Sequence, residues 1–252
     1  MLLRLALMGI LGIVTVQPVL AEDAAKPVRA LIVTGGHDFD RAEFFAAFDT
    51  MKGITWKEVQ HPAANDMYTK EASEQYDVVV LYDMVQTISE EQKQNLIRLL
   101  KEDGKGLVAV HHCLSSYQDW PEYTRIIGGK YYLADVVENG KVVRPGSTYD
   151  HDQKFRVQIV DPAHPITKGI TDFEIEDETY KGFEVLEGVK PLLRVEHPKC
   201  GPIVGWTHDY GKAHVAYTLL GHDKKGYENE GFRGLVRNAI LWAAKQDGEA
   251  KP

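Results

Sequence analysis

The chain has 252 residues, of which 44% are hydrophobic and 26% charged, so disorder, collagen and coiled coil are poor descriptions of it. Its 29 Lys and Arg against 37 Asp and Glu give a net charge of −8, which argues against a general phosphate-binding surface and against a nucleic-acid partner. The two cysteines, Cys113 and Cys200, cannot form a disulfide framework, so the fold must rest on a buried core; whether they pair is left open.

Residues 1–21 have the pattern of a secretory signal peptide. A positive residue precedes an apolar run over residues 5–16, and small or medium-sized residues stand at positions −3 and −1 of a cut after Ala21. The run is short for a membrane span, which needs about 20 residues, although an uncleaved anchor is the alternative. We therefore expect a periplasmic or secreted protein without stable membrane insertion after cleavage, in which residues 22–252 form one domain.

Strands and helices alternate in the first half of the chain. Strands are predicted at residues 28–33, 55–59, 77–82 and 107–110. The last two are continuous apolar runs, which is typical of strands buried on both faces of a parallel sheet. Between them, Ser89 and Gln92 match a capping box, and Leu96, Leu99 and Leu100 make a helical stripe. This alternation predicts an α/β fold with a mostly parallel sheet covered on both faces.

The second half of the chain is mixed. Further strands are predicted at residues 155–159, 191–195, 203–206 and 214–219, and an amphipathic helix is predicted over residues 232–243. Residues 130–154 read as a long polar connection that runs over the edge of the sheet, and long loops of this kind are often functional.

Histidines gather directly after the predicted strands. They are His37, His61, His111, His112 and His222, and His151 joins them if residues 130–154 fold over the same edge. In open α/β sheets, ligands bind outside the carboxyl ends of the strands. Because histidine titrates near neutral pH and is the commonest metal ligand, this concentration indicates a functional site.

Each histidine also has an ordinary structural interpretation. His61 and His164 stand beside prolines and fit loop or turn roles better than functional ones. His37 and the pair at 111–112 follow fully apolar strands, which favours function. For His222 and Asp223 the two interpretations are equal, since such a pair can simply cap the next turn.

Three chemistries fit these residues. His37, His111 and His151 are possible ligands of a divalent metal, although no HExxH or CxxC spacing supports a metal site. General acid/base catalysis would use a histidine oriented by an aspartate such as Asp38, Asp83 or Asp223. Nucleophilic catalysis would use Cys113, but the glycine flanks of a strained nucleophile turn are absent. No GxGxxG pattern follows the first strand, so no nicotinamide cofactor is expected, and no other cofactor is certain.

Aromatic residues lie near these positions in the sequence, among them Trp120, Tyr123 and Tyr149. Rings with an apolar face and a polar rim suit sugars, which carry both kinds of surface. Ordinary core packing is an equal alternative for any one of them.

Several blocks along the chain resemble the ThuA-like proteins, named for trehalose utilisation. They are Leu31–His37, Tyr76–Asp83, Gly104–His112, Trp120–Tyr123 with Ile127–Gly129, Ser147–His151, His164–Thr167, Asp177–Tyr180, Gly221–Asp223 and Tyr227–Asn229. The resemblance covers residues 29–245, and the blocks stand in the family's order.

The resemblance implies a flavodoxin-like three-layer sandwich similar to class I glutamine amidotransferases. In those relatives a nucleophilic cysteine follows the strand that here precedes His111, so glutaminase chemistry is not inherited. The family is associated with bacterial uptake and breakdown of trehalose and similar disaccharides, alongside dehydrogenases that make 3-keto sugars.

We therefore expect an exported enzyme of carbohydrate catabolism, a hydrolase, lyase or isomerase rather than a glutamine amidotransferase. Its partner would be a small-molecule sugar, a trehalose-like disaccharide or a 3-keto derivative, and histidine acid/base chemistry would act on it, with a divalent metal as a possible aid. The expected catalytic residues are His37, His111, His112 and Asp223, and the expected substrate-binding residues are Trp120, Tyr123, Tyr149, His151 and His222. The alternative is a non-catalytic sugar-binding module, which would need aromatics and amides more than titratable groups.

Overall fold

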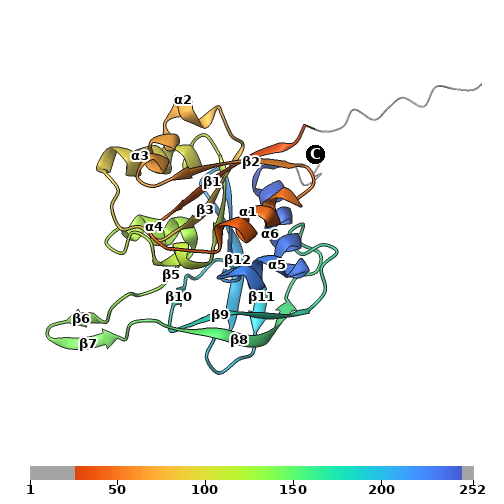
Figure 1. Cartoon of the computed structure of the whole chain (residues 1–252). Helices are drawn as coiled ribbons and strands as arrows, with labels where there is room; N and C mark the ends of the chain where they lie inside the picture. Colours follow the sequence, from red (N-terminus) through yellow and green to blue (C-terminus); the bar gives the residue numbers. More distant parts are fainter. Residues whose placement is uncertain (1–25, 246–252) are drawn as a thin grey trace, which may run out of the picture.

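A nine-stranded sheet runs through the middle of the molecule (Figure 1). The computed structural model describes residues 26–245, so the predicted signal peptide lies outside the described residues. From one edge to the other, the strands are β2 (Ile54–Gln60), β1 (Val28–Gly35), β3 (Val78–Asp83), β4 (Gly106–Val110), β13 (Ala213–Thr218), β12 (Ile203–Tyr210), β11 (Lys190–Val195), β8 (Thr148–Ile159) and β9 (Phe173–Lys181).

The first five strands in this order are parallel. β1 pairs with β2 and β3, and β4 pairs with β3 and β13. Every residue of β3 and β4 is buried, as their continuous apolar runs predict. The other four strands, β12, β11, β8 and β9, are added in antiparallel pairs. The predicted α/β class and its parallel sheet are thus confirmed.

Helices cover both faces of the parallel strands, which makes three layers (Figure 1). On one face lie α1 (Arg41–Asp49), α5 (Lys224–Glu228) and α6 (Glu230–Ala243), which contact one another. On the other face lie α2 (Lys70–Ser73), α3 (Glu90–Lys101) and α4 (Pro121–Ile127), together with the 3-10 helices η1 (Ala63–Tyr68) and η2 (His111–Ser115). In the described range, no helix is both long and apolar enough to cross a membrane.

Local sequence signals explain the two longest helices. Ser89 and Gln92 form the predicted capping box at the start of α3, and Leu96, Leu99 and Leu100 are its buried residues. At the start of α6 the Asn229 side chain accepts hydrogen bonds from two backbone amides, and the predicted apolar face of this helix is buried.

Residues 130–154 differ from the predicted polar connection. They contain a projecting hairpin of β6 (Val136–Glu138) and β7 (Lys141–Arg144) and the first half of β8 (Figure 1). The connecting residues Asn139 and Gly140 have φ values of 51° and 75°, the left-handed pair that a two-residue hairpin turn requires. Two short strands, β5 (Gly129–Lys130) and β10 (Glu184–Val185), pair separately beside this region.

The antiparallel ribbon of β8 and β9 positions the site. It runs across beneath the parallel strands in Figure 1, and β9 contacts α5. This path brings side chains of β8 and β9 to the carboxyl ends of β4 and β13, although two or more strands separate them in the sheet order.

Candidate functional site

His111 lies at the sharp turn between β4 and η2. Its φ is 54°, a left-handed conformation that costs a non-glycine residue on the order of 1–3 kcal/mol and is enriched at functional sites. The side chain is fully buried, and Nδ1 donates a hydrogen bond to the Leu219 carbonyl oxygen at 2.5 Å. Because a carbonyl oxygen only accepts, Nδ1 carries a proton and Nε2 faces the rest of the site.

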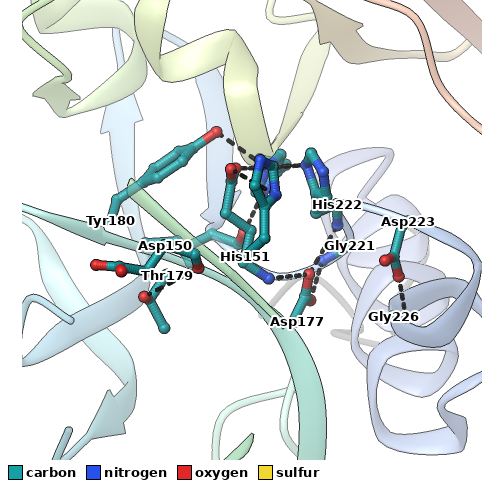
Figure 2. A network of polar contacts seen from close by, with 12 residues as sticks. Asp150, His151, Asp177, Thr179, Tyr180, Gly221, His222, Asp223 and Gly226 are labelled. Atoms are coloured by element: carbon teal, nitrogen blue, oxygen red, sulfur yellow. Dashed lines mark hydrogen bonds and ion pairs between the residues drawn. The ribbon is translucent and has the colours of Figure 1, made fainter. Parts of the chain in front are cut away.

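Three groups meet the Nε2 atom of His111. They are Glu178 Oε2 at 2.9 Å, the Tyr180 hydroxyl at 2.9 Å and His222 Nδ1 at 3.1 Å. Figure 2 shows Tyr180 and His222 approaching this centre from opposite sides. Glu178 and Tyr180 come from β9, whereas His222 follows β13, so segments far apart in the sequence form this cluster.

Asp177 fixes the turn that carries His222. Its buried carboxylate accepts hydrogen bonds from the backbone amides of Gly221 at 2.6 Å, His222 at 2.9 Å and Glu178 at 2.8 Å (Figure 2). Gly221 has a φ of 95°, and a Cβ there would come within 2.5 Å of the Phe232 ring, so only glycine fits. One buried carboxylate therefore ties β9 to the turn after β13.

His151 contacts the second oxygen of Glu178. Its Nδ1 lies 3.2 Å from Glu178 Oε1, and its ring centroid lies 4.8 Å from that of His222. His151 belongs to β8 and is about half exposed, so it closes the outer side of the cluster.

His112 is buried, yet neither of its ring nitrogens has a hydrogen-bond partner within residues 26–245. Its ring stacks on His37 at 4.6 Å and packs against Tyr82 at 4.4 Å. His37 reaches this place through the turn after β1, where Gly36 has a φ of 79° and a Cβ would lie 2.0 Å from the Met84 carbonyl oxygen. A buried polar group without a partner is costly, so His112 is a candidate position for a ligand contact.

The electrostatics of the cluster separate its histidines. Burial opposes charge on His111, but the hydrogen bond and negative charge of Glu178 outweigh it and raise the pKa of His111. Burial and the neighbouring His111 lower the pKa of His222 to about 4, and burial with three histidine neighbours lowers the pKa of His112. Burial would raise the pKa of Glu178, but His111 holds it below its usual value. Glu178 therefore favours a proton on His111, whereas burial disfavours one on His112 and His222.

A cavity of about 210 Å³ opens beside this cluster. It is lined by His37, Met84, His112, Ser115, Tyr131, Leu133, Tyr149, His151, Glu178 and Tyr180. A neighbouring cavity of about 530 Å³ is lined by residues 34–39, Arg41, Gln60 and His61. His37 lines both cavities.

The structure brings most of the sequence-predicted site residues together. His37, His112, His151 and Tyr149 line the smaller cavity, while His111 and His222 lie behind it against Glu178. Tyr149 is 58% exposed, and its ring approaches that of His151.

Three other predicted residues lie elsewhere. Trp120 and Tyr123 stack on each other in the hydrophobic core and line neither of these cavities. The Asp223 carboxylate caps α5 by accepting from the amides of Lys225 and Gly226, which is the structural alternative given above for this residue.

The two cysteines are buried and unpaired. Burial raises the pKa of the Cys113 thiol well above its usual value, so a thiolate nucleophile is disfavoured there. Cys200 is affected in the same way, and burial raises its pKa to about 12.

Sequence reasoning did not select Asp177 or Glu178. They lie on β9, whose alternating acidic residues gave no apolar strand signal. The signal that could have found them is the block Asp177–Tyr180, which is among the stretches that resemble the ThuA-like proteins.

One group in the described part of the chain has the composition of a metal site. The His111, Glu178 and His222 ligand atoms all lie within 4.8 Å of one another. The metal ligands predicted from the sequence were His37, His111 and His151. Only His111 is in the group found here, and its other two members are Glu178 and His222. Two imidazoles and one carboxylate are a common ligand set for divalent transition metals.

Comparisons with known proteins agree with this architecture. The model of a family described as ThuA, trehalose utilisation, matches residues 29–243. A putative ThuA-like protein from Parabacteroides merdae aligns with a TM-score of 0.73 and 20% identity, over 90% of this chain and 93% of that one. A second, from Bacteroides uniformis, aligns with a TM-score of 0.64 and 18% identity, over 92% and 98%.

A more distant structure is the cytoplasmic protein STM1381 from Salmonella typhimurium, with a TM-score of 0.60 and 13% identity over 86% of this chain and 99% of that one. At these identities the solved structures show a shared fold. No curated protein sequence matches the chain.

Proposed function

The chain belongs to the ThuA family, which is described by trehalose utilisation, and from this premise we propose that it is an exported enzyme of carbohydrate catabolism. Its substrates are trehalose-like disaccharides or their 3-keto derivatives, and its reaction is a hydrolysis, elimination or isomerisation assisted by histidine. The observation that carries this proposal is the convergence of five histidines on Glu178 and the adjoining cavity.

The cavities suit a disaccharide. The smaller one combines the aromatic rings of Tyr131, Tyr149 and Tyr180 with polar ring nitrogens, a lining that matches the mixed surface of a sugar. The larger one continues past His37 toward Asp38 and Arg41. A disaccharide would place one ring in each cavity, with its glycosidic oxygen near His37.

The proton chemistry is assigned from position. His112 lines the cavity, and its two buried ring nitrogens have no hydrogen-bond partner within residues 26–245, so we assign it the role of accepting a proton from the substrate or returning one. His37 stacks on His112 and lines both cavities, so we assign it to the other side of the same bond. His111 lies deeper and acts through Glu178 and His222.

The test is turnover of trehalose and 3-keto-trehalose by the purified chain, with products followed by NMR. We expect one of these sugars to be consumed, and we expect His112→Ala to lower the rate by about 100- to 10,000-fold. The matched control is His214→Ala, which removes a histidine outside the site, paired with Asp209. Binding of either sugar without any turnover would contradict the proposed enzymatic activity and favour a non-catalytic sugar-binding module.

Export is the remaining part of the proposal. It is supported by the signal-like pattern of residues 1–21, which predicts a mature chain beginning near Glu22. Mass spectrometry of the protein from the periplasm or medium is expected to show this start. A protein that retains Met1 would contradict export by cleavage.

A further inference from the structure

We propose that His111 Nε2, Glu178 Oε2 and His222 Nδ1 bind one divalent transition-metal ion, with an open coordination position toward the 210 Å³ cavity. The site deepens the proposed function by adding a Lewis acid beside the sugar. It does not rest on the identity of that sugar, because the argument uses only ligand geometry and hydrogen-bonding capacity.

The first argument is the crowding at His111 Nε2. An imidazole nitrogen has a single in-plane valence, which holds either one proton or one lone pair. Three polar atoms nevertheless approach this nitrogen at 2.9, 2.9 and 3.1 Å. One proton cannot serve all three well, whereas a cation between His111, Glu178 and His222 would attract the lone pair of each.

The second argument is the size of the triangle. Its sides are 2.9 Å from His111 to Glu178, 3.1 Å from His111 to His222 and 3.4 Å from His222 to Glu178. A point equidistant from such corners lies about 1.8 Å from each in their plane, and Zn²⁺ bonds to N and O ligands are about 2.0–2.1 Å. An ion about 0.9 Å out of the plane therefore reaches all three atoms at bonding distance without any movement of the side chains.

The third argument is the support behind each ligand. Histidines that bind metals usually donate their other ring N–H to a carbonyl or carboxylate, which fixes the tautomer. His111 Nδ1 makes this bond to the Leu219 carbonyl oxygen. The backbone amide of His222 is held by Asp177, so that histidine too is anchored.

The ligand set indicates the class of ion. Two imidazoles suit Zn²⁺ and other late divalent transition metals, whereas Mg²⁺ and Ca²⁺ prefer oxygen ligands. Three protein ligands with one position left open are the pattern of catalytic zinc sites. Glu178 and Tyr180 line the cavity, so a ligand there could reach the open position.

The experiment is a Zn²⁺ titration of the untagged full chain after dialysis against a chelator. Calorimetry is expected to give one Zn²⁺ per chain, and Zn²⁺ is expected to raise the unfolding midpoint because it binds only the folded site. Mg²⁺ in the same titration is expected to show no binding. A parent chain that binds no Zn²⁺ and shows no shift of its midpoint would overturn the proposal.

Variants locate the ion. His222→Ala and Glu178→Gln each remove one ligand and are expected to weaken Zn²⁺ binding by at least about 100-fold. His214→Ala removes a histidine at the other end of β13 and is expected to bind Zn²⁺ as the parent does. Circular dichroism confirms folding; if one ligand variant fails to fold, the other decides.

Unchanged binding in a folded ligand variant would overturn the assignment. Zn²⁺ binding without any sugar turnover would overturn the proposed function and leave the metal site standing. Sugar turnover in a chain that binds no metal would overturn the metal site and leave the proposed function standing.

Discussion

Histidines lie at both ends of the parallel strands, and the two groups differ in their partners. At the carboxyl end, His111, His151 and His222 all contact Glu178. At the opposite end, His164, His208 and His214 line one large cavity. There, His214 bonds to Asp209 and stacks on Trp242.

The other two histidines of the opposite end bond to the backbone. His164 Nδ1 accepts from the amide of Ile166, two residues further along the chain, and His208 Nε2 donates to the Arg125 carbonyl oxygen. Within residues 26–245, Asp209 bonds to His214 and its negative charge acts on His208, so at this end one carboxylate lies near two histidines.

Cavity size alone would select the opposite end. The cavity at the opposite end measures about 760 Å³ and the one beside Glu178 about 210 Å³. What distinguishes the carboxyl end is convergence: His111 meets groups 67 and 111 positions away in the sequence, and the rings of His111, His151 and His222 all contact the Glu178 carboxylate. Convergence of titratable groups from distant segments is a better mark of a functional site than volume or histidine number.

Replacing His111 gives the largest expected effect. His111→Gln keeps a polar side chain of similar size but removes the imidazole that meets Glu178 and His222. We expect sugar turnover to fall by about 100- to 10,000-fold, measured as kcat/KM on whichever sugar the parent consumes. Near-parental activity would show that sugar turnover does not depend on the histidine cluster at the carboxyl end.

Cys113→Ala is the matched variant, two residues from His111 in the sequence. This thiol is fully buried and its pKa is raised, so it contributes packing rather than a nucleophile. We expect unchanged turnover and a loss of about 1 kcal/mol in unfolding free energy, read from urea unfolding. Loss of turnover in Cys113→Ala, with His111→Gln active, would favour nucleophilic catalysis by cysteine.

Asp177→Asn tests how the carboxyl end is held together. The carboxylate accepts hydrogen bonds from three backbone N–H groups. The asparagine side chain would direct its NH₂ group at one of these donors. We expect a loss of about 1–3 kcal/mol in unfolding free energy, together with weaker Zn²⁺ binding because the His222 turn loosens. A variant with parental stability and parental Zn²⁺ affinity would show that Asp177 does not position His222.

Glu122→Gln tests the opposite end, where the expected effect is smallest. Hydrogen bonds from Tyr210, Lys101 and Arg125 lower the pKa of Glu122 to about 2. A depressed carboxyl pKa adds stability above the unfolded-state value of about 4.3, and this stability is lost as the pH falls toward 2.

Glu122 and its partners are partly exposed, so we expect Glu122→Gln to lower the unfolding free energy by about 0.5–1 kcal/mol at pH 7 and not at all near pH 2. We expect sugar turnover to stay at the parental rate. Thermal unfolding of parent and variant across this pH range is the measurement. A stability difference between parent and variant that grows toward acid pH would contradict the lowered pKa of Glu122.

Much of the fold follows from local sequence signals. The apolar runs of β3 and β4, the capping box at Ser89 and the apolar face of α6 each act over a few residues, so they predict the elements that they form. The hairpin of β6 and β7 was missed although Asn139 and Gly140 carry a known turn signal.

The site was predictable only in part. The position of a histidine after a buried strand places it at the carboxyl end, which is why His37, His111, His112 and His222 were selected. Glu178 could not be found this way because it lies in the middle of β9, and only the path of β8 and β9 beneath the parallel strands brings it to His111. That path depends on pairing between strands far apart in the sequence, which no local pattern encodes.

The most direct test of the central claim follows all histidine rings at once. The chain is labelled with ¹⁵N histidine, and ring signals, assigned from single His→Ala variants, are recorded during a titration with trehalose and then with 3-keto-trehalose. The account predicts shifts for His37, His112 and His151, and unchanged signals for His164, His208 and His214. Shifts confined to the second group, or no shift in either group with both sugars, would contradict it.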